Sequence, residues 1–220
     1  ALGTAVAGLL IESGATCHIP VVNPKELERF PHTGQCRIAE GVELTDEGAV
    51  ETFYKRFDAP GMKLWASVHI AGGFGMSPAA ETSKASFVGM MQGNALTCFL
   101  CCREAVKRMK GGGGGGRIVN VAARPGLIPE QGAGMVAYTA SKAAVAAITQ
   151  ALGAEVAGDG ILVNAVVPSI MDTRANRAAM PDADFSKWPK LEEVAATIGF
   201  LASPDNKVTR GGLVPVYGRA

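Results

Sequence analysis

The chain has 220 residues, of which 48% are hydrophobic, and its 21 basic residues nearly balance 20 acidic ones. This length fits a single globular domain over residues 1–220, with enough apolar side chains for one large core. A formal net charge of +1, with both signs interspersed, excludes the charge pattern of a nucleic-acid-binding protein. Because no apolar run reaches the length of about 18 residues that a membrane span needs, we expect no membrane partner.

The predicted elements, in chain order, alternate between short apolar runs that end in Gly, Pro or Asn and longer segments of helical period. This pattern predicts an α/β fold: a doubly wound parallel sheet with helices on both faces. The predicted strands are 15–20, 37–42, 64–70, 117–122, 161–167 and 212–217. The predicted helices are 2–12, 46–57, 84–109, 138–157 and 191–202. Residues 172–190 fit neither pattern and are predicted to leave the fold as an excursion, whereas the glycine run 111–116 is predicted to form a flexible turn.

The beginning of the sequence departs from this pattern. A doubly wound nucleotide-binding fold begins with a strand, and a glycine-rich turn then leads into the first helix, where backbone N–H groups meet the cofactor pyrophosphate. Here Leu2 and Gly3 open a helical segment and match the tail of such a turn, so the first strand and most of the turn are absent from the sequence. A sheet that lacks its central strand would expose two unpaired edges, and we therefore expect natural residues to precede Ala1.

The five cysteines form an odd set without the paired spacing of a zinc site, which predicts no metal centre. Cys101 and Cys102 are adjacent in a helical segment, where buried free thiols fit. A reducing cytoplasm is the expected location.

Tyr138 and Lys142 lie one helical turn apart at the start of a long apolar segment. Side chains four residues apart share a helix face, so a phenol and an ammonium group become neighbours. Because a nearby cation favours the charged form of a phenol, whose free pKa is about 10, we expect the pKa of Tyr138 to fall and the phenol to exchange a proton near neutral pH. In isolation such a pair is more often a packed tyrosine with a solvated lysine.

These pieces, in this order, resemble the short-chain dehydrogenase/reductase family over essentially the whole chain. Gly3 closes the glycine turn, the segment 69–72 stands at the Asn-Asn-Ala-Gly motif, Asn94 stands at the helix asparagine, and the segment 168–173 stands at the Pro-Gly motif. The resemblance implies a Rossmann-like oxidoreductase that uses NAD(P)H on a small-molecule substrate and assembles as a homodimer or homotetramer. The apolar stretches 99–109 and 143–152 would then pack against a second subunit, although helix-on-sheet burial produces the same pattern.

The resemblance also implies roles for individual residues. Tyr138 would donate the proton, Lys142 would lower its pKa and bind the nicotinamide ribose, and Asn94 would place a water in a relay to Lys142. The alternative for Asn94 is hydrogen bonding to nearby backbone, and His69 fits a satisfied core histidine better than a catalytic base. The residues assigned to the cofactor are Leu2, Gly3, Glu43, Leu44, Ala71, Gly72, Gly73, Tyr138, Lys142, Pro168, Ser169, Ile170 and Thr173.

One departure bears on the substrate, because Ala123 occupies the position of the family's serine. Loss of a donor that holds the reacting oxygen can cost on the order of a hundredfold in rate. The dihydropteridine reductase branch also carries alanine there, and its lid is similar to residues 172–188. We therefore predict a small flat carbonyl or imine-like substrate, with a quinonoid dihydropterin as one candidate. A conventional ketone or alcohol dehydrogenase and a non-catalytic nucleotide-binding protein are the alternatives.

Two further questions stay open at the level of sequence. Residues 18–24 contain no carboxylate to select NAD, and Lys25 and Arg29 either meet the 2′-phosphate of NADP or face water. Phe185 and Trp188 either close over a flat ring or pack on the body of the protein.

Overall fold

The computed structural model of the chain describes residues 1–219, and it confirms the α/β fold with a parallel sheet and helices on both faces. Its strands form two sheets, one of order β1-β2 and one of order β3-β4-β5-β6, and every pairing is parallel. The strands are β1 His18–Val21, β2 Arg37–Glu40, β3 Ala66–His69, β4 Gly116–Val121, β5 Ile161–Pro168 and β6 Leu213–Val216.

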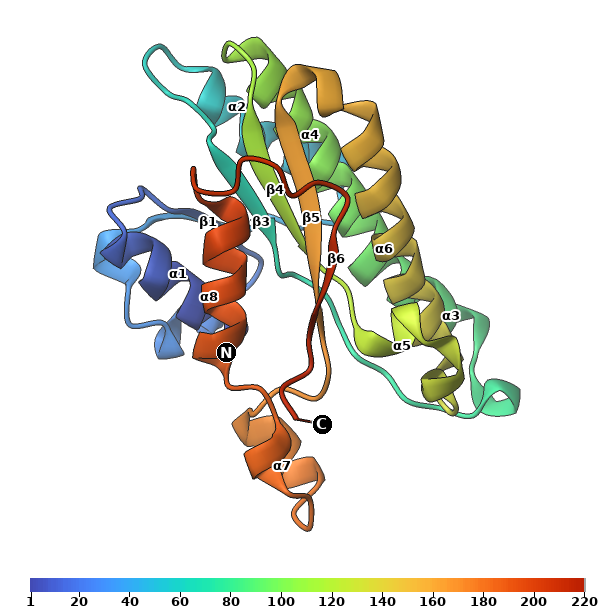
Figure 1. Cartoon of the computed structure of the whole chain (residues 1–220). Coiled ribbons are helices and arrows are strands. Elements are labelled where there is room, and N and C mark those ends of the chain that lie inside the picture. The colour runs from blue at the N-terminus through green and yellow to red at the C-terminus, as the bar shows by residue number, and fades with distance from the viewer. Residues whose placement is uncertain (220) are drawn as a thin grey trace.

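The helices lie in two layers around the four-stranded sheet. In Figure 1, α4 and α6 cover one face of this sheet, and α1 and α8 cover the other. The α-helices are α1 Leu2–Glu12, α2 Glu47–Lys55, α3 Lys84–Met90, α4 Thr97–Gly111, α5 Arg124–Leu127, α6 Val136–Glu155, α7 Arg174–Ala179 and α8 Leu191–Ala202. Alternate residues of a strand face opposite layers, so Ile118 packs toward α4 while Val119 packs toward α8. Both faces of β4 and β5 are therefore apolar, as the continuous apolar runs predict.

The sequence located every one of these strands within three residues at each end, but it treated two helices too simply. The predicted helix 84–109 contains a π-helical turn, Met91–Leu96, between α3 and α4. The predicted helix 46–57 ends at Lys55 and continues as a 3-10 turn, Arg56–Asp58. The glycine run does form a turn before β4: Gly113, Gly114 and Gly115 have φ values of +93°, +78° and +77°, which glycine alone adopts without strain.

The continuous helix from Lys84 to Gly111 is long and apolar enough to cross a membrane by length and composition, which differs from the sequence-based expectation. Its α4 portion packs along the four-stranded sheet through Leu100, Ala105 and Met109. Because a helix packed on a sheet needs the same apolar face, this helix is weak evidence for a membrane.

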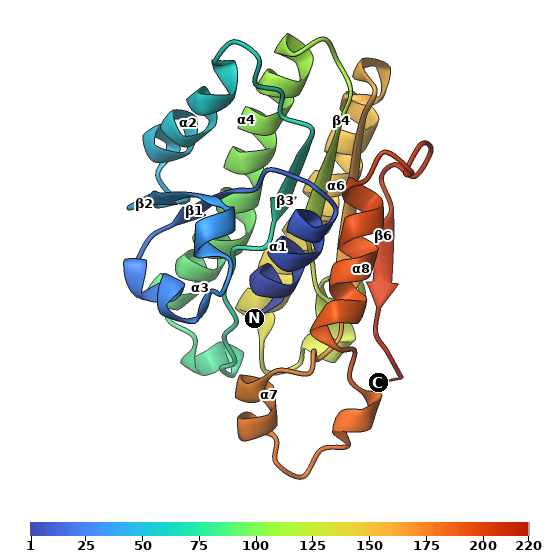
Figure 2. The same cartoon turned by 90° about the vertical axis from the view of Figure 1, so that its left-hand side faces the viewer.

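A cavity of about 790 Å³ separates the two sheets. The edges of β1 and β3 line it through Ile19 and Val68, α1 closes one side through Val6, and α4 closes the other through Cys98. Figure 2 shows β1 and β2 set apart from β3, with α1 in front of the space between them. The cavity thus lies where the sheet is interrupted and runs along the edge of β3, which is the place that the expected central strand would occupy. That expectation stays a prediction.

Candidate active site

The candidate site lies at the carboxyl ends of the strands, where ligands bind in open α/β sheets. In Figure 1 the strand arrows point toward the edge at which α3, α5 and α7 gather. The segment Ala71–Gly73 follows β3 at this edge, Ala123 follows β4, and Pro168 ends β5.

Asn94 fixes the segment after β3. It projects from the π-helical turn, is almost fully buried, accepts a hydrogen bond from the Gly73 N–H at 2.9 Å, and donates to the Gly73 carbonyl at 3.0 Å. Its amide also donates to Ser141 Oγ at 3.0 Å. The side chain therefore clamps a backbone distant in sequence, and it makes the backbone hydrogen bonds of the alternative role for Asn94.

Gly72 brings this segment close to Lys142. A Cβ atom at residue 72 would lie 2.4 Å from Asn94 Oδ1 and 3.4 Å from Lys142 Nζ. Only glycine therefore fits, because the first distance is far inside van der Waals contact. The structure brings Gly72, Asn94 and Lys142 together, as the motifs indicate.

Lys142 is buried, and its ammonium donates to the Val121 carbonyl at 2.8 Å. Burial lowers the pKa of Lys142 to about 8, because the charged form loses most of its hydration. The lysine is thus a positioned interior group and not a solvated one.

Tyr138 differs from the sequence-based expectation. Burial raises the pKa of Tyr138 to about 12, whereas a neighbouring cation was expected to lower it. Desolvation of the phenolate is the larger effect here, and the Lys142 ammonium is directed to the Val121 carbonyl. The phenol ring contacts Phe74 edge-to-face at a centroid distance of 5.0 Å, and Phe74 is 65% exposed.

The position of the family's serine is apolar. Ala122 and Ala123 are both buried, and neither side chain donates a hydrogen bond. Ser141, the nearest candidate to replace the missing hydroxyl, is fully buried and donates to the Tyr138 carbonyl at 2.7 Å. Ser141 is therefore part of the Asn94 network and does not replace the serine.

The segment after β5 lies beside this group at the same edge. Ser169 Oγ donates to the Tyr217 carbonyl at 2.8 Å, and Ile170 is exposed. Thr173 caps α7, because its Oγ1 accepts from the Asn176 N–H at 3.1 Å. The cap leaves the Thr173 hydroxyl hydrogen free to bind an acceptor such as a carboxamide oxygen.

The residues assigned to the adenosine half of the cofactor lie apart from the catalytic group. Glu43 accepts hydrogen bonds from the Thr45 backbone and hydroxyl at 3.0 and 2.9 Å, and Asp46 caps α2. Leu44 and Gly3 line the cavity between the sheets, and Leu2 is buried. Ala71 lines the same cavity, which therefore runs between this half of the predicted site and the catalytic half.

The excursion 172–190 contains α7, and the Asp172 N–H donates to the Pro189 carbonyl, which closes its two ends on each other. Trp188 is buried and packs against Phe185 at a centroid distance of 4.9 Å. The two alternatives for these aromatics are closing over a flat ring and packing on the body of the protein. Trp188 follows the second.

Sequence reasoning missed a buried polar network behind this site. His69 Nδ1 lies 2.8 Å from Asn120 Oδ1, and His69 Nε2 lies 2.8 Å from Ser67 Oγ. Asn120 in turn donates to Thr149 Oγ1 at 2.9 Å. His69 is thus a satisfied core histidine, as expected, but apart from Ser67 on the same strand its partners are distant in sequence and leave no pattern of spacing.

The site fits a nicotinamide cofactor. The Ala71–Gly73 segment carries no bulky side chain, and the structure leaves Gly73 open enough that an added Cβ would first meet Met90 at 3.6 Å. Ile170 and the Thr173 hydroxyl face the same edge from the other side. Flat heterocycles with a carboxamide suit this combination of close backbone and a free hydroxyl donor.

Comparisons with known proteins agree with this geometry. The model of the short chain dehydrogenase family matches residues 1–184. A short-chain type dehydrogenase/reductase of Picea abies is 36% identical over 148 residues, which are 63% of this chain and 54% of that protein. Galactitol 2-dehydrogenase of Rhizobium johnstonii is 36% identical over 159 residues, which are 66% of this chain and 60% of the relative. The chain thus spans little more than half the length of these two relatives.

Among solved structures, ElxO with NADP bound is similar over 99% of this chain and 93% of its own, with a TM-score of 0.87 and 25% identity. That neighbour binds NADP, which is the class of cofactor that the geometry of this site fits. On the family match over residues 1–184, the chain belongs to the short-chain dehydrogenase family of oxidoreductases.

Proposed function

We propose that this protein is a reductase that transfers hydride from NAD(P)H to a small flat carbonyl or imine-like substrate, with Tyr138 as the proton donor. One observation carries the proposal: burial raises the pKa of the Tyr138 phenol, and the position at which a hydroxyl donor would hold a ketone oxygen is the buried Ala123. Because its pKa is raised, the phenol is a weak acid that keeps its proton at neutral pH and gives it only to a strongly basic acceptor, such as the anion that forms as the substrate accepts hydride. The protonated phenol suits reduction, and the apolar serine position favours substrates that need no second hydroxyl donor.

The bound cofactor would supply the hydride, and the chain would supply the proton and the geometry. As the substrate carbon accepts hydride, its oxygen or nitrogen would take the phenolic proton, and the Lys142 ammonium would turn from the Val121 carbonyl to stabilise the phenolate that remains. Lys142 would also bind the nicotinamide ribose. Asn94 acts as a positioning residue that holds the Ala71–Gly73 segment against the cofactor, and the water relay stays a prediction.

The cofactor would lie along the edge of the sheet. Ala71, Gly72 and Gly73 would approach its ribose and pyrophosphate, and the segment Pro168, Ser169, Ile170 and Thr173 would contact the carboxamide. Gly3 with Leu2, and Glu43 with Leu44, would contact the pyrophosphate and adenine. Lys25 and Arg29 are both exposed, which supports tolerance of a 2′-phosphate.

The substrate class remains the finer part of the proposal. A quinonoid dihydropterin is an imine-like ring that accepts a proton without a serine clamp, and the exposed face of Phe74 beside Tyr138 offers a surface for such a ring. The likeness to the dihydropteridine reductase branch rests on Ala123 and on the lid 172–188. Because Trp188 packs on the body, the lid contributes less to this assignment than Phe74 does.

A second candidate is a conventional alcohol dehydrogenase. One relative is a galactitol 2-dehydrogenase. A polyol carries hydroxyl groups that can hydrogen-bond internally in place of the missing serine. In this reading the enzyme would oxidise a secondary alcohol, with Tyr138 as the base.

The test follows nicotinamide absorbance with the full-length protein, NADH and NADPH in parallel, and two substrate sets: quinonoid dihydropterin with small cyclic imines, and polyols with secondary alcohols. Turnover of the first set, lost in Tyr138→Phe, supports the reductase. Turnover of the second set alone would show that the substrate is an alcohol and not a flat carbonyl or imine. Cofactor binding with no turnover of either set would indicate a non-catalytic nucleotide-binding protein.

We also propose that the protein forms a homodimer or homotetramer in a reducing cytoplasm. Phe87, Leu96 and Phe99 are exposed along the helix formed by α3 and α4, which supports a second copy on this face. Light scattering of the full-length protein tests the assembly, and a monomer at micromolar concentration would contradict it.

A further inference from the structure

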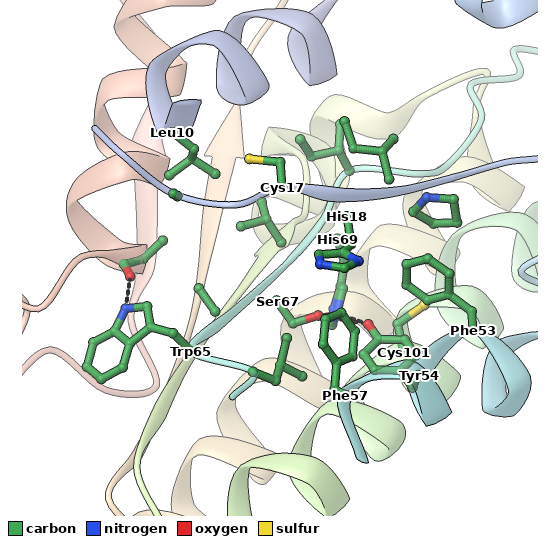
Figure 3. Close-up of a pocket in the computed structure, with 18 of the residues that line it drawn as sticks. Leu10, Cys17, His18, Phe53, Tyr54, Phe57, Trp65, Ser67, His69 and Cys101 are labelled. Atoms are coloured by element: carbon green, nitrogen blue, oxygen red, sulfur yellow. Dashed lines mark hydrogen bonds between the residues drawn. The ribbon is translucent and has the colours of Figure 1, made fainter. Parts of the chain in front are cut away.

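Three soft donor groups converge behind the candidate active site. His69 ends β3, and Cys98 and Cys102 lie on successive turns of α4, four residues apart on one helix face. One ligand atom from each of the three lies within 4.8 Å of the other two. Figure 3 shows His69 at the cavity wall beside Ser67 and Tyr54.

We propose that His69, Cys98 and Cys102, with Asn120 as the fourth donor, form a binding site for a thiophilic divalent cation such as Zn²⁺. Imidazole and thiolate are the ligands that Zn²⁺ prefers, and two thiolates would neutralise the charge of the ion in a buried place. The site is separate from the proposed hydride transfer and does not depend on it.

The distances already approach a tetrahedral site. Zn–S and Zn–N bonds of about 2.3 and 2.0 Å imply tetrahedral edges of roughly 3.5 Å between sulfur and a nitrogen or oxygen donor, and roughly 3.8 Å between two sulfurs. Cys102 Sγ lies 3.5 Å from His69 Nδ1 and 3.5 Å from Asn120 Oδ1, so two edges have the required length. The Cys98 donor needs a shift of at most about 1 Å, which a χ1 adjustment supplies.

The surrounding hydrogen bonds supply the support that metal-bound histidine needs. The Asn120 amide donates to Thr149 Oγ1, so Asn120 Oδ1 faces His69 and accepts the Nδ1 hydrogen. When Nδ1 binds the ion, the ring proton moves to Nε2, which then donates to Ser67 Oγ at 2.8 Å. Ser67 can donate onward to the Tyr54 hydroxyl at 2.8 Å, because either oxygen of that pair serves as donor.

The proton count of this binding step balances. The imidazole stays neutral because it loses the hydrogen on Nδ1 and gains one on Nε2. Each thiol releases its proton to solvent as its Zn–S bond forms, so Zn²⁺ and two thiolates make a neutral centre. Asn120 Oδ1 loses its hydrogen-bond donor in the same step and becomes free to bind the ion. His69 and Cys98 line the cavity between the sheets, which gives the ion a path to the site.

The chain offers a matched control in Cys101. It is buried on the same helix, next to Cys102, but its thiol contacts Tyr54 and not His69. Cys17 and Cys36 lie close together just before β1 and β2, away from this cluster, and their replacement by serine removes a second pair of thiols from the experiment.

The experiment titrates the full-length, reduced protein carrying Cys17→Ser and Cys36→Ser with Cd²⁺ and records the thiolate-to-metal absorption band, followed by displacement with Zn²⁺. One equivalent of Cd²⁺ is expected to saturate the band. The band should be retained in Cys101→Ser and lost in Cys98→Ser and Cys102→Ser. Thermal unfolding without metal establishes that each variant is folded.

His69→Gln provides a readout that does not depend on replacing a cysteine. It should retain a thiolate band but weaken Cd²⁺ binding by at least about tenfold. The proposal is overturned if the parent protein shows no band, if the band keeps its intensity in Cys98→Ser, or if His69→Gln binds Cd²⁺ as tightly as the parent.

Discussion

The two sheets of this molecule differ in how completely they are packed. β4 and β5 are buried along nearly their whole length between α4 and α6 on one side and α1 and α8 on the other. β1 and β2 have few buried residues, and a cavity lies along the edge of β1. The catalytic group stands at the end of the packed sheet, whereas the residues assigned to adenosine stand around the open one.

This difference shows which half of the candidate site is positioned by the four-stranded sheet and its helices alone. Asn94 and Lys142 are held by hydrogen bonds to Gly73 and to the Val121 carbonyl, Ser141 bonds to the backbone carbonyl of Tyr138, and these bonds need only the four-stranded sheet and its helices. The position of Glu43 and Leu44 depends instead on how the β1–β2 sheet is joined to the rest. We therefore expect proton transfer by Tyr138 to depend little on the β1–β2 sheet. Cofactor affinity should depend instead on what fills the cavity between the two sheets.

Two tyrosines, one at the candidate site and one in the core beside the cavity, provide the largest contrast. Tyr138→Phe should lower kcat by about 10²–10⁴-fold, because it removes the only proposed proton donor, while cofactor binding and stability change little. Tyr54→Phe removes a buried hydroxyl that pairs with Ser67 at 2.8 Å, so it should cost about 1 kcal/mol in the free energy of unfolding and leave kcat within twofold. Steady-state kinetics and denaturant unfolding of both variants check this. Equal losses of kcat would show that Tyr138 has no special role.

Two adjacent glycines test the clamp that Asn94 places on the backbone of Gly73. Gly72→Ala places a methyl group 2.4 Å from Asn94 Oδ1, so the clamp on Gly73 must move, and kcat/KM should fall by about ten- to a hundredfold. Gly73→Ala meets only the flexible end of Met90 at 3.6 Å and should change kcat/KM by less than about threefold. A Gly72→Ala enzyme as active as Gly73→Ala would mean that the clamp does not position the reaction.

The pH dependence of reduction separates Lys142 from Tyr138. With a pKa lowered to about 8, the Lys142 ammonium is present below that pH and is lost above it, whereas the phenol keeps its proton up to about pH 12. The reduction rate should therefore fall about tenfold per unit above pH 8, with Lys142 as the cause. Lys142→Arg, which stays charged, should be slower overall but lack this decline. A decline that persists in Lys142→Arg belongs to another group.

Much of this fold could be predicted from sequence, because its information is local. Apolar runs such as 161–167 predict buried parallel strands, and the helices 2–12 and 191–202 were placed at both ends as the structure has them. The π-helical turn was not predicted, because the amide of Asn94 bonds to a backbone that is distant in sequence.

The sequence named candidate site residues, but it did not predict how the structure shifts the pKa of Tyr138. The spacing of Tyr138 and Lys142 identifies the pair, yet the direction of the Tyr138 pKa depends on how deeply the phenol is buried, and burial is a tertiary property. The His69 cluster was invisible for the same reason, since β3, β4 and α4 each contribute donors with no shared spacing. The domain boundaries and the roles of the site residues remain predictions.

The smallest expected effect comes from making the same substitution, isoleucine to valine, in each of the two sheets. Ile118→Val removes a methylene from a fully buried position in β4 and should cost about 1 kcal/mol in the free energy of unfolding. Ile19→Val changes a partly exposed residue on β1 that lines the cavity, so it should cost only a few tenths of a kcal/mol. Denaturant midpoints measure both. If a further strand fills the cavity in the full-length protein, Ile19 becomes a core residue and its substitution should cost as much as that of Ile118, so the ratio of the two costs reports directly on whether the sheet is continuous.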